Sequence, residues 1–377
     1  MKALGIYVIY DRDGTVDDYV YKMLKDLLLI CDNLVVVING NIDTLHKDSL
    51  KRIANNVYIR RNSGFDAGAY ADVIVNYLGK DRLCVYDTIV LCNDTFYGTF
   101  KCIVDIFDDM KKYRYDYWGI DYVDRDFLSY IVTYFCVFEG KKIISDFLFD
   151  YFSCNVLDKI GDIHDAFARF EVGLTFYAKN KGYRVGSYCN CNGVSSSRNP
   201  DVCCIKYGLP IWKKKYFEAN SYKKEISDNL LAYLREKLDY DVNDILSSTG
   251  RKYGITCDYS KKFDYAKISE VKKTYSIPNI TYSKIRNFVD NNDEILIYGI
   301  GSFGKATHFI FKDIIKDFRG FVSTCPEMDE TSNFRVYSPD DISAGTGVII
   351  ALNEEHTREI IPFVNNLNKT NPVLLWW

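Results

Sequence analysis

Residues 60–70 read Arg-Arg-Asn-Ser-Gly-Phe-Asp-Ala-Gly-Ala-Tyr, and they combine charge with small side chains just before an expected helix. Glycine lets a ligand approach the backbone closely, and a helix N-terminus offers free N–H groups to a diphosphate. The two arginines would add positive charge, and Asp66 would bind a sugar hydroxyl or a metal ion. The spacing alone favours an ordinary helix start that is capped by Asn62, Ser63 or Asp66, so both interpretations stay open.

A second polar group, Asn93-Asp94-Thr95, ends an apolar strand in the segment 86–98. A carboxylate at such a strand end can hold a divalent cation, Mn²⁺ or Mg²⁺, that neutralises a diphosphate leaving group. Most sites of that kind carry two acids as Asp-x-Asp, whereas here only Asp94 is acidic. A metal at Asp94 is therefore one hypothesis, and a strand-end turn with a capping Asx side chain is the other.

A single carboxylate, Glu171, lies on a helix whose other face is apolar, with Phe167, Phe170, Leu174 and Tyr177 at helical spacing. A carboxylate at the border of an apolar face can have a raised pKa and act as a general base. The alternative is the solvated flank of an amphipathic helix, which is the commoner arrangement.

Two further clusters have both a chemical and a structural interpretation. Lys213-Lys214-Lys215 could contact a diphosphate or an anionic membrane surface, or could be a solvated charged run. Cys189, Cys191, Cys203 and Cys204 do not have the spacing of zinc knuckles, so we predict buried thiols there.

The last part of the chain contains Gly299-x-Gly301-x-x-Gly304 between an expected strand, 294–298, and an expected helix, 305–316. This is the context of a Rossmann-like nucleotide loop. The next strand ends in Ser323 and Thr324, without the acid that would bind a ribose. We therefore predict a Rossmann-like module that binds a nucleotide or acts only in assembly, and we expect no NAD.

The elements that must position these residues alternate between strands and helices in the first part of the chain. This rhythm predicts an α/β domain with a mostly parallel sheet, in which ligands bind beyond the carboxyl ends of the strands. The expected strands are 4–10, 33–38, 57–60, 87–92, 116–120 and 131–138, and the expected helices are 16–30, 43–54, 68–79, 101–112, 141–152 and 162–181. The strand-end rule selects the loops 11–15, 60–68 and 93–98.

Length and composition limit the class of protein. The 377 residues predict two or three domains, and the net charge of −3 argues against a general nucleic-acid binder. The start of the chain reads as a core strand rather than a signal peptide, and no apolar run is long enough to cross a bilayer. We expect a cytoplasmic protein in a reducing compartment, with at most peripheral contact at the inner face of the membrane.

Seven short stretches, in one consistent order, resemble the rhamnan synthesis protein F family over about residues 1–250. The stretches are VDDYV at 16–20, RNSGFDAGAY at 61–70, IVLCNDTFYG at 89–98, DYWGI at 116–120, TYFCVF at 133–138, EVGLT at 171–175 and PIWKKKYF at 210–217. This family consists of glycosyltransferases of polysaccharide assembly with a GT-A-like fold. The resemblance implies transfer of a sugar, with rhamnose favoured, from a nucleotide donor to a growing surface or lipid-linked glycan.

The resemblance also implies roles for residues. It implies donor contacts at Tyr10, Asp11, Arg61, Asn62, Gly64, Asp66, Asn93 and Thr95, an acceptor wall at Trp118 and Gly119, and catalytic roles for Asp94 and Glu171. Glu171 would be the base of an inverting transfer. With the resemblance in place, we predict a GT-A-like domain at 1–215, a helical connector at 216–285 and a Rossmann-like domain at 286–377. Two alternatives stay open: an NAD(P)-dependent or nucleotide-sugar-modifying enzyme that uses the last domain, and a non-catalytic scaffold of polysaccharide assembly.

Overall fold

The computed structural model describes residues 2–124, 129–218, 222–258, 260–271, 282–325 and 334–375. The chain forms two compact units. The first takes in the described residues of 1–125, 129–157 and 178–273, and the second those of 158–177 and 274–377. The predicted domain boundaries after residues 215 and 285 stay predictions. By packing, the segment 158–177 groups with the end of the chain, and the expected connector groups largely with the first unit.

The first unit is built on a seven-stranded sheet of order β10-β6-β9-β4-β1-β2-β3. Its strands are β1 (Ala3–Ile9), β2 (Asn33–Asn39), β3 (Asn56–Arg60), β4 (Thr88–Asn93), β6 (Tyr117–Gly119), β9 (Phe135–Glu139) and β10 (Val185–Ser187). Neighbouring strands pair in parallel except at β9, which is antiparallel to both β4 and β6. The predicted α/β fold with a mostly parallel sheet is confirmed.

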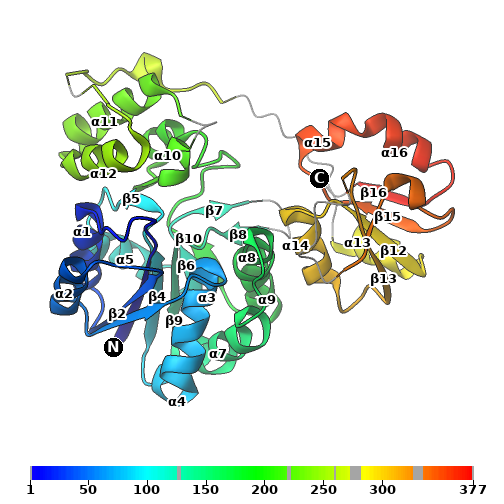
Figure 1. Ribbon diagram of the computed structural model, residues 1–377, viewed down its shortest axis with the longest axis horizontal. Helices are drawn as coiled ribbons and strands as arrows, with labels where there is room; N and C mark the ends of the chain where they lie inside the picture. The colour runs from blue at the N-terminus through cyan, green and yellow to red at the C-terminus, as the bar shows by residue number, and fades with distance from the viewer. Residues whose placement is uncertain are drawn as a thin grey trace. The chain divides into compact units, whose positions relative to one another are not determined.

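The central strands are buried on both faces, which explains their continuous apolar runs. Every residue of β1 is buried, and every residue of β4 as well. Tyr7 and Ile9 of β1 pack into the core that α1 (Asp18–Leu27) and α5 (Ile103–Lys111) share. Helix α1 buries Tyr19, Val20, Met23, Leu24 and Leu27, the three- and four-residue spacing of one helix face. The helices α3 and α4 cover the opposite face of the sheet (Figure 1).

The other helical elements of the first unit follow the alternating pattern of the sequence. They are α2 (Thr44–Ile53), α3 (Phe65–Ala71), a π-helical segment (Asp72–Leu78), α4 (Gly79–Leu83), α6 (Lys141–Ile143) and α7 (Phe149–Tyr151), the last two each followed by a π-helical segment (Ile144–Leu148 and Phe152–Val156). The expected helix 68–79 thus starts earlier and runs further. The expected strand 131–138 is divided between β8 (Tyr130–Ile131), which pairs with β7 (Tyr122–Val123), and β9.

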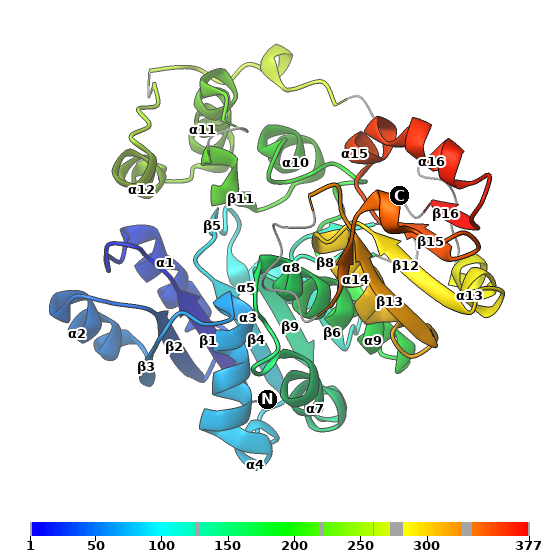
Figure 2. The same ribbon diagram turned by 45° about the vertical axis from the view of Figure 1, so that its right-hand side comes forward.

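A second layer of the first unit lies above the carboxyl ends of the parallel strands. The short strand β5 (Phe96–Gly98) pairs antiparallel with β11 (Ile211–Lys213), as Figure 2 shows. A 3-10 turn (Lys214–Phe217) follows β11, and the helices are α10 (Pro200–Tyr207), α11 (Lys224–Leu238) and α12 (Asn243–Tyr253), with a 3-10 turn at Tyr265–Lys267. Because β5 comes directly after Asn93-Asp94-Thr95, its pairing with β11 brings Lys213 and Lys214 to that strand end.

The second unit contains a five-stranded parallel sheet of order β14-β13-β12-β15-β16. Its strands are β12 (Glu294–Tyr298), β13 (Asp317–Val322), β14 (Val336–Tyr337), β15 (Gly347–Ile350) and β16 (Val373–Leu375). Its helices are α13 (Tyr282–Asp290), α14 (Ser302–Phe311), α15 (Glu354–Glu359) and α16 (Ile361–Leu367), with a 3-10 turn at Pro339–Asp341. Helix α8 (Ile163–Ala166) and the π-helical segment Phe167–Gly173 pack on α14 within this unit, and the helix continues as α9 (Leu174–Asn180).

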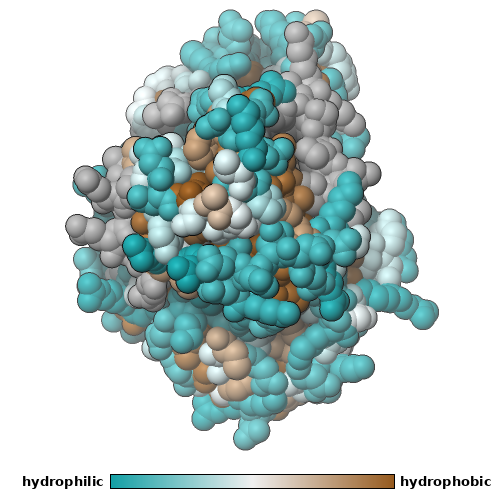
Figure 3. Space-filling model, turned by 90° about the vertical axis from the view of Figure 1, so that its right-hand side faces the viewer, coloured by the Kyte–Doolittle hydropathy of each residue, from teal (hydrophilic) through white to brown (hydrophobic). Residues whose placement is uncertain are grey.

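The described residues include no helix that is both long and apolar enough to span a membrane. On the face shown in Figure 3, hydrophobic residues occur as small areas between hydrophilic ones. Single apolar residues on a surface are normal in folded proteins and mark no particular site.

Candidate functional site

The polar loops selected by the strand-end rule meet at one edge of the large sheet. Strand β1 ends just before Asp11, and β4 ends at Asn93, which lies beside Val8 of β1 in the strand register. Strand β3 ends at Arg60, beside Asn39 of β2. The four strands are parallel neighbours, so these loops share the edge at which α/β sheets bind ligands.

The loop 60–70 is a tightly held turn. Gly64 precedes α3 in the left-handed conformation, at φ 72°, and no side chain caps the helix from that position. The N-cap position of this helix is therefore held by Gly64, and not by Asn62, Ser63 or Asp66, the three caps that the sequence suggested. A Cβ on Gly68 would lie 2.4 Å from the Ser63 carbonyl oxygen, so the turn needs glycine there.

Arg60 is committed to the turn itself. Its guanidinium donates to Asp72, to Asn39 Oδ1 at 2.7 Å and to the Ser63 carbonyl at 3.0 Å. Arg61 and Asn62 are both exposed. Of the two arginines in this loop, Arg61 is thus the one whose charge could reach a ligand.

Asp66 and the Asn93-Asp94-Thr95 triplet form one hydrogen-bonded group. Asn93 Nδ2 donates to Asp66 Oδ2 at 2.7 Å, and the Ala67 amide donates to Asp66 Oδ1 at 2.8 Å. Thr95 donates to Asn93 Oδ1 from its hydroxyl at 2.6 Å and from its amide at 3.1 Å. Burial raises the pKa of Asp66, although these bonds oppose the shift. The opening loop and the second strand-end loop are therefore a single structure.

Asp94 pairs with Lys214 in the interior of this edge. Lys214 Nζ lies 3.4 Å from Asp94 Oδ2, and the two side chains are 10% and 7% exposed. Lys214 also donates to the Tyr19 hydroxyl at 2.6 Å, and that hydroxyl donates to the Asp94 carbonyl at 3.0 Å. Burial lowers the pKa of Lys214 to about 8, and the Asp94 carboxylate opposes that shift.

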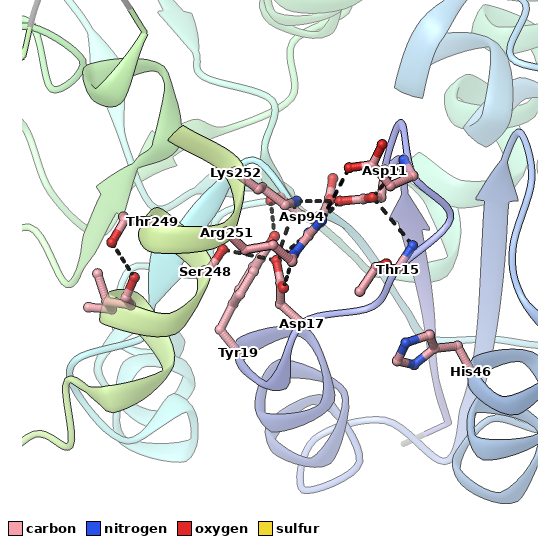
Figure 4. Close-up of polar contacts among 12 residues, drawn as sticks. Asp11, Thr15, Asp17, Tyr19, His46, Asp94, Ser248, Thr249, Arg251 and Lys252 are labelled. Atoms are coloured by element: carbon pink, nitrogen blue, oxygen red, sulfur yellow. Dashed lines mark hydrogen bonds and ion pairs between the residues drawn. The ribbon is translucent and has the colours of Figure 1, made fainter. Parts of the chain in front are cut away.

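A second set of ion pairs adjoins this one, as Figure 4 shows. Arg251 donates to Asp11 Oδ2 at 2.6 Å and, through Nε, to Asp17 Oδ1 at 2.8 Å, while Lys252 Nζ lies 2.9 Å from Asp11 Oδ2. Ser248 donates to Asp17 Oδ2 at 2.9 Å. The bonds from Arg251 and Lys252 outweigh burial and lower the pKa of Asp11. Burial would lower the pKa of Lys252, but Asp94 and Asp11 together raise it.

These cations come from parts of the chain that sequence reasoning treated as remote. Arg251 and Lys252 stand in the last turn of α12, which packs on α1, in the segment expected to be a connector. Lysine and arginine are favourable at a helix C-terminus because they complement its partial negative charge. Nothing in their local spacing points to Asp11, so only the packing of α12 on α1 reveals them.

The sequence analysis did not identify a further buried carboxylate at the same edge, that of Asp121. Asp121 follows β6 and is 3% exposed, and it accepts from Ser196 Oγ at 2.6 Å and from the Tyr122 amide at 2.9 Å. Burial raises the pKa of Asp121, and Ser196 and Lys213 oppose the shift. Its position directly after an expected strand is the signal that could have identified it.

The other predicted site residues of the first unit lie in different environments. Tyr10 is 50% exposed beyond β1. Trp118 is 1% exposed, and its ring packs edge-on against Phe107 with centroids 5.0 Å apart. A Cβ on Gly119 would lie 2.3 Å from Ile131 Cγ2. In this arrangement Trp118 and Gly119 are part of the hydrophobic core. A sugar could stack on the Trp118 ring only after the residues that cover the ring had moved away. Their assignment to the acceptor stays a prediction.

The family model described as Rhamnan synthesis protein F matches residues 34–295. The chain belongs to the rhamnan synthesis protein F family. It is therefore a nucleotide-sugar glycosyltransferase, and the order of its large sheet accords with the predicted GT-A-like fold class, which is confirmed. The match begins at β2 and extends beyond the residues that carried the resemblance, up to β12.

No curated protein matches the chain. Among solved structures, it is similar to a putative nucleotide-diphospho-sugar transferase from Desulfovibrio desulfuricans G20 (13% identity, 63% of this chain and 98% of that chain, TM-score 0.32). It is also similar to TarS 1-349 from S. aureus in complex with UDP (14% identity, 67% of this chain and 75% of that chain, TM-score 0.28). A cytidylyltransferase from Leptospira borgpetersenii shows the same level of similarity (14% identity, 69% and 99%, TM-score 0.33). Likenesses this low carry no argument about substrate.

The acids of this family member do not fit a divalent cation at Asp94. Mg²⁺ and Mn²⁺ prefer several oxygen ligands, with Mg²⁺ bonds of about 2.0–2.1 Å. Asp94 Oδ2 instead faces an ammonium, Asp11 and Asp17 are bound by Arg251 and Lys252, and Asp66 accepts from Asn93. Among the described residues, no group of three or more His, Cys, Asp or Glu side chains could hold a metal.

The four cysteines for which the sequence predicted buried thiols are buried in the structure. Cys189, Cys191, Cys203 and Cys204 are buried free thiols, and Cys189 Sγ lies 3.9 Å from Cys191 Sγ. Burial raises the pKa of Cys204, which favours the uncharged thiol. They contribute to the core of the first unit.

Glu171 lies in the second unit, within the π-helical segment Phe167–Gly173, and is half-buried. Its neighbours along the chain, Phe170 and Val172, are buried, as the apolar stripe predicted. The general-base role of Glu171 stays a prediction.

The glycine loop of the second unit starts α14 against α8. A Cβ on Gly304 would lie 1.8 Å from the Gly299 carbonyl oxygen, so this glycine allows the helix to approach the strand. Ser302 Oγ lies 2.8 Å from His164 Nδ1, and Lys305 Nζ lies 2.5 Å from Asp162 Oδ2. Gly299, Gly301 and Gly304 thus have a packing role in this unit, and nucleotide binding there stays a prediction.

Proposed function

We propose that the protein transfers a sugar from a nucleoside-diphosphate donor to a growing surface polysaccharide or lipid-linked glycan, with rhamnose the first donor sugar to test. The observation that carries this proposal is the hydrogen-bonded junction of Asp66 with Asn93 and Thr95 at the carboxyl edge of the large sheet. It joins the two polar loops that the sequence selected independently, in a chain whose family is established.

The donor would lie along this edge. The Asp11 loop and Tyr10 would contact the nucleoside, and Arg61 and the backbone near Gly64 would face the diphosphate or the sugar. Asp66 accepts hydrogen bonds at both oxygens already, yet carboxylate oxygens can accept more than one, so a sugar hydroxyl could still donate to it. Thr95 is exposed and would reach the same ligand.

The reaction would proceed by direct displacement. An acceptor hydroxyl oxygen forms the new bond to the anomeric carbon as the bond from that carbon to the donor diphosphate breaks. The hydroxyl proton goes to a carboxylate base, for which we propose Glu171, and the electron pair of the broken bond stays on the diphosphate oxygen. This single displacement inverts the anomeric carbon. Asp94 would hold the cationic group that faces the diphosphate.

A donor screen tests this function. The full chain is incubated with dTDP-rhamnose and with UDP-, GDP- and CDP-sugars, and release of nucleoside diphosphate is measured with and without a glycan acceptor. We expect release with one nucleotide class, lost by at least tenfold in Asp66→Ala and in Glu171→Gln. The exposed change Asp48→Asn, in α2, is the matched control. Full activity in both site variants would refute the site assignment, and no turnover with any donor would favour the scaffold alternative.

A further inference from the structure

We propose that Lys214 is a built-in cation of the donor site, so that the donor diphosphate is bound through an ammonium group of the chain and without a divalent metal ion. This inference rests on the proposed function, because it assigns the group that receives the diphosphate at the same sheet edge. The sequence left a diphosphate contact, a membrane contact and a solvated run open for Lys213-Lys214-Lys215, and the contacts of Lys214 with Asp94 and Tyr19 single out this one lysine.

The charges of the strand-end triplet support this assignment. In an Asp-x-Asp site, two carboxylates and one divalent cation together carry no net charge. Here the two acidic positions of that motif hold Asn93 and Thr95, which are neutral, and Asp94 is the middle residue, so the triplet carries one negative charge instead of two. Lys214 supplies a single positive charge beside Asp94, at 3.4 Å from Oδ2. One carboxylate and one ammonium again sum to zero, so the local balance is kept with a monovalent cation.

The position of Lys214 is fixed by the backbone around it. Its amide donates to the Thr95 carbonyl at 2.9 Å, so the residue is tied to the triplet that it serves. The preceding residues form β11, whose Lys213 pairs with Phe96 of β5, only three residues after Asn93. Tyr19 holds the ammonium from the other side at 2.6 Å. A cation held this firmly is pre-organised, which is what stabilisation of a leaving group requires.

The neighbouring acids are not available to a metal ion. Asp11 and Asp17 are each bound by both Arg251 and Lys252. A metal ion on Asp94 Oδ2 would also stand next to the Lys214 ammonium, because ligand distances of about 2 Å and an ammonium at 3.4 Å compete for the same oxygen. The carboxylates of Asp11, Asp17 and Asp94 are thus each paired with a cationic side chain of the protein itself.

A second lysine widens the cationic surface. Lys252 Nζ and Lys214 Nζ lie 5.9 Å and 5.0 Å from the centroid of the same Tyr19 ring. Lys213 ends β11 and Lys214 begins the 3-10 turn, and the ammonium of Lys213 lies 4.8 Å from the centroid of a different ring, that of Tyr134. Lys214 and Lys252 therefore form one cationic pair around Tyr19, and Lys213 a separate charge.

In the transfer step, Lys214 would act without forming a covalent bond. The bond between the anomeric carbon and the diphosphate oxygen breaks, and the electron pair stays on that oxygen. The ammonium of Lys214 donates a hydrogen bond to the diphosphate and so stabilises its growing charge. The proton released by the acceptor goes to the base named above, and no metal or redox partner takes part.

The first test uses the unmodified full chain. Binding of UDP, dTDP, GDP, CDP and ADP is measured by calorimetry, once in EDTA and once in excess Mn²⁺. We expect one nucleotide to bind with dissociation constants that agree within about twofold in the two conditions. An affinity that appears only with Mn²⁺, or that rises tenfold or more, would overturn the inference and leave the proposed function intact.

The second test removes the ammonium. Lys214→Met keeps the length and apolar stem of the side chain, and we expect it to weaken nucleoside-diphosphate binding by at least tenfold. The corresponding monophosphate should lose less, because it lacks the terminal phosphate that Lys214 contacts. The adjacent and exposed change Lys215→Met is the matched control and should bind like the wild type. Equal losses for diphosphate and monophosphate would contradict a role at the terminal phosphate.

Two further outcomes can occur: the Lys214→Met variant does not fold, or the wild type binds no nucleoside diphosphate. If Lys214→Met does not fold, Lys214→Arg keeps a cation, and the EDTA comparison on the wild type still decides the metal question. If none of the five nucleoside diphosphates binds with or without Mn²⁺, the proposed function fails, and this inference fails with it. Failure of the inference alone has a different signature, which is metal-dependent binding.

Discussion

At the scale of single residues, the interior of the sheet edge contains a nearly buried ion pair between Lys214 and Asp94. Lys214 and Asp94 are both nearly buried, and a buried ion pair costs more to break than an exposed one because the remaining charge stays desolvated. The pair therefore affects folding as well as any ligand. A stability measurement separates the two contributions, since it needs no donor.

A double-mutant cycle tests the strength of this pair. Lys214→Met and Asp94→Asn should each lower the free energy of unfolding by about 3 kcal/mol, because each leaves one charge buried without its partner. The double variant should lose clearly less than the sum of the single variants. Urea unfolding of the full chain measures these values.

The exposed pair Lys80–Asp150 provides the control for the cycle. Its ammonium and carboxylate lie 3.0 Å apart, but the side chains are 46% and 53% exposed. The corresponding changes, Lys80→Met and Asp150→Asn, should cost less than about 1 kcal/mol each. Equal effects at the two pairs would mean that burial of Lys214 has no energetic consequence.

A histidine of the second unit gives a pH dependence with a definite sign. Burial lowers the pKa of His308 to about 4, and Arg169 and Lys312 add to the shift. Its ring lies among Phe318, Phe321 and Phe334. Below pH 6.5 an unfolded chain binds a proton at this position that the folded unit binds only near pH 4, so the stability of the unit falls as the pH is lowered through this window.

Removal of the histidine should remove this part of the pH dependence. His308→Gln should lose less stability than the wild type between pH 6.5 and pH 4.5, by roughly 2 kcal/mol. Hydrogen exchange of α14 amides at each pH reports on this unit alone. Identical pH profiles in the two proteins would show that His308 titrates normally in the folded state.

At the scale of elements, the two glycine loops illustrate different demands of packing. In the first unit Gly68 allows α3 to begin against the Ser63 carbonyl, and in the second Gly304 allows α14 to approach β12. The sequence left a ligand site and a structural role open for both loops, because small residues suit a ligand and a close helix equally well. The structure shows the packing reason at both, and ligand binding at either needs its own test.

The glycines of the second loop should respond very differently to substitution. Gly304→Ala places a methyl group where the Gly299 carbonyl oxygen is 1.8 Å away, so we expect a loss of about 1–3 kcal/mol in the second unit. Gly301→Ala should change stability by less than about 0.5 kcal/mol, because its nearest neighbour is His164 Cε1 at 3.9 Å. Exchange protection of β12 and α14 measures both. Similar losses in the two variants would contradict the packing role.

At the scale of the whole molecule, the order of the chain and the order of packing differ. The segment 158–177 lies in the middle of the sequence but packs with residues of the last third. Phe167 meets Phe303 edge-on at 6.0 Å, and Arg169 lies over the Phe309 ring at 4.9 Å. The second unit therefore cannot be removed by a single cut without leaving part of its core behind.

A truncated chain tests this division. A protein that ends at residue 285 should expose the faces of Phe167 and Tyr177 that pack on α14, so it should bind an apolar dye several-fold more strongly than the full chain and tend to associate. Dye fluorescence and light scattering at equal concentration measure this. A truncated chain that is monomeric, with the dye binding of the full chain, would show that residues 158–177 are stable without the last third.

The sequence by itself determined the α/β class, the mostly parallel sheet and the loops at its carboxyl edge, because hydrophobic periodicity and strand-end chemistry are local properties. The sequence also indicated the protein family, through short motifs that occur in the family's order along the chain. Only the tertiary structure decided which charges meet at that edge. Lys214 is 120 residues from Asp94, and Arg251 is 240 residues from Asp11, and no spacing rule connects such distant positions. Their contacts follow from the pairing of β5 with β11 and the packing of α12 on α1, which depend on the whole fold.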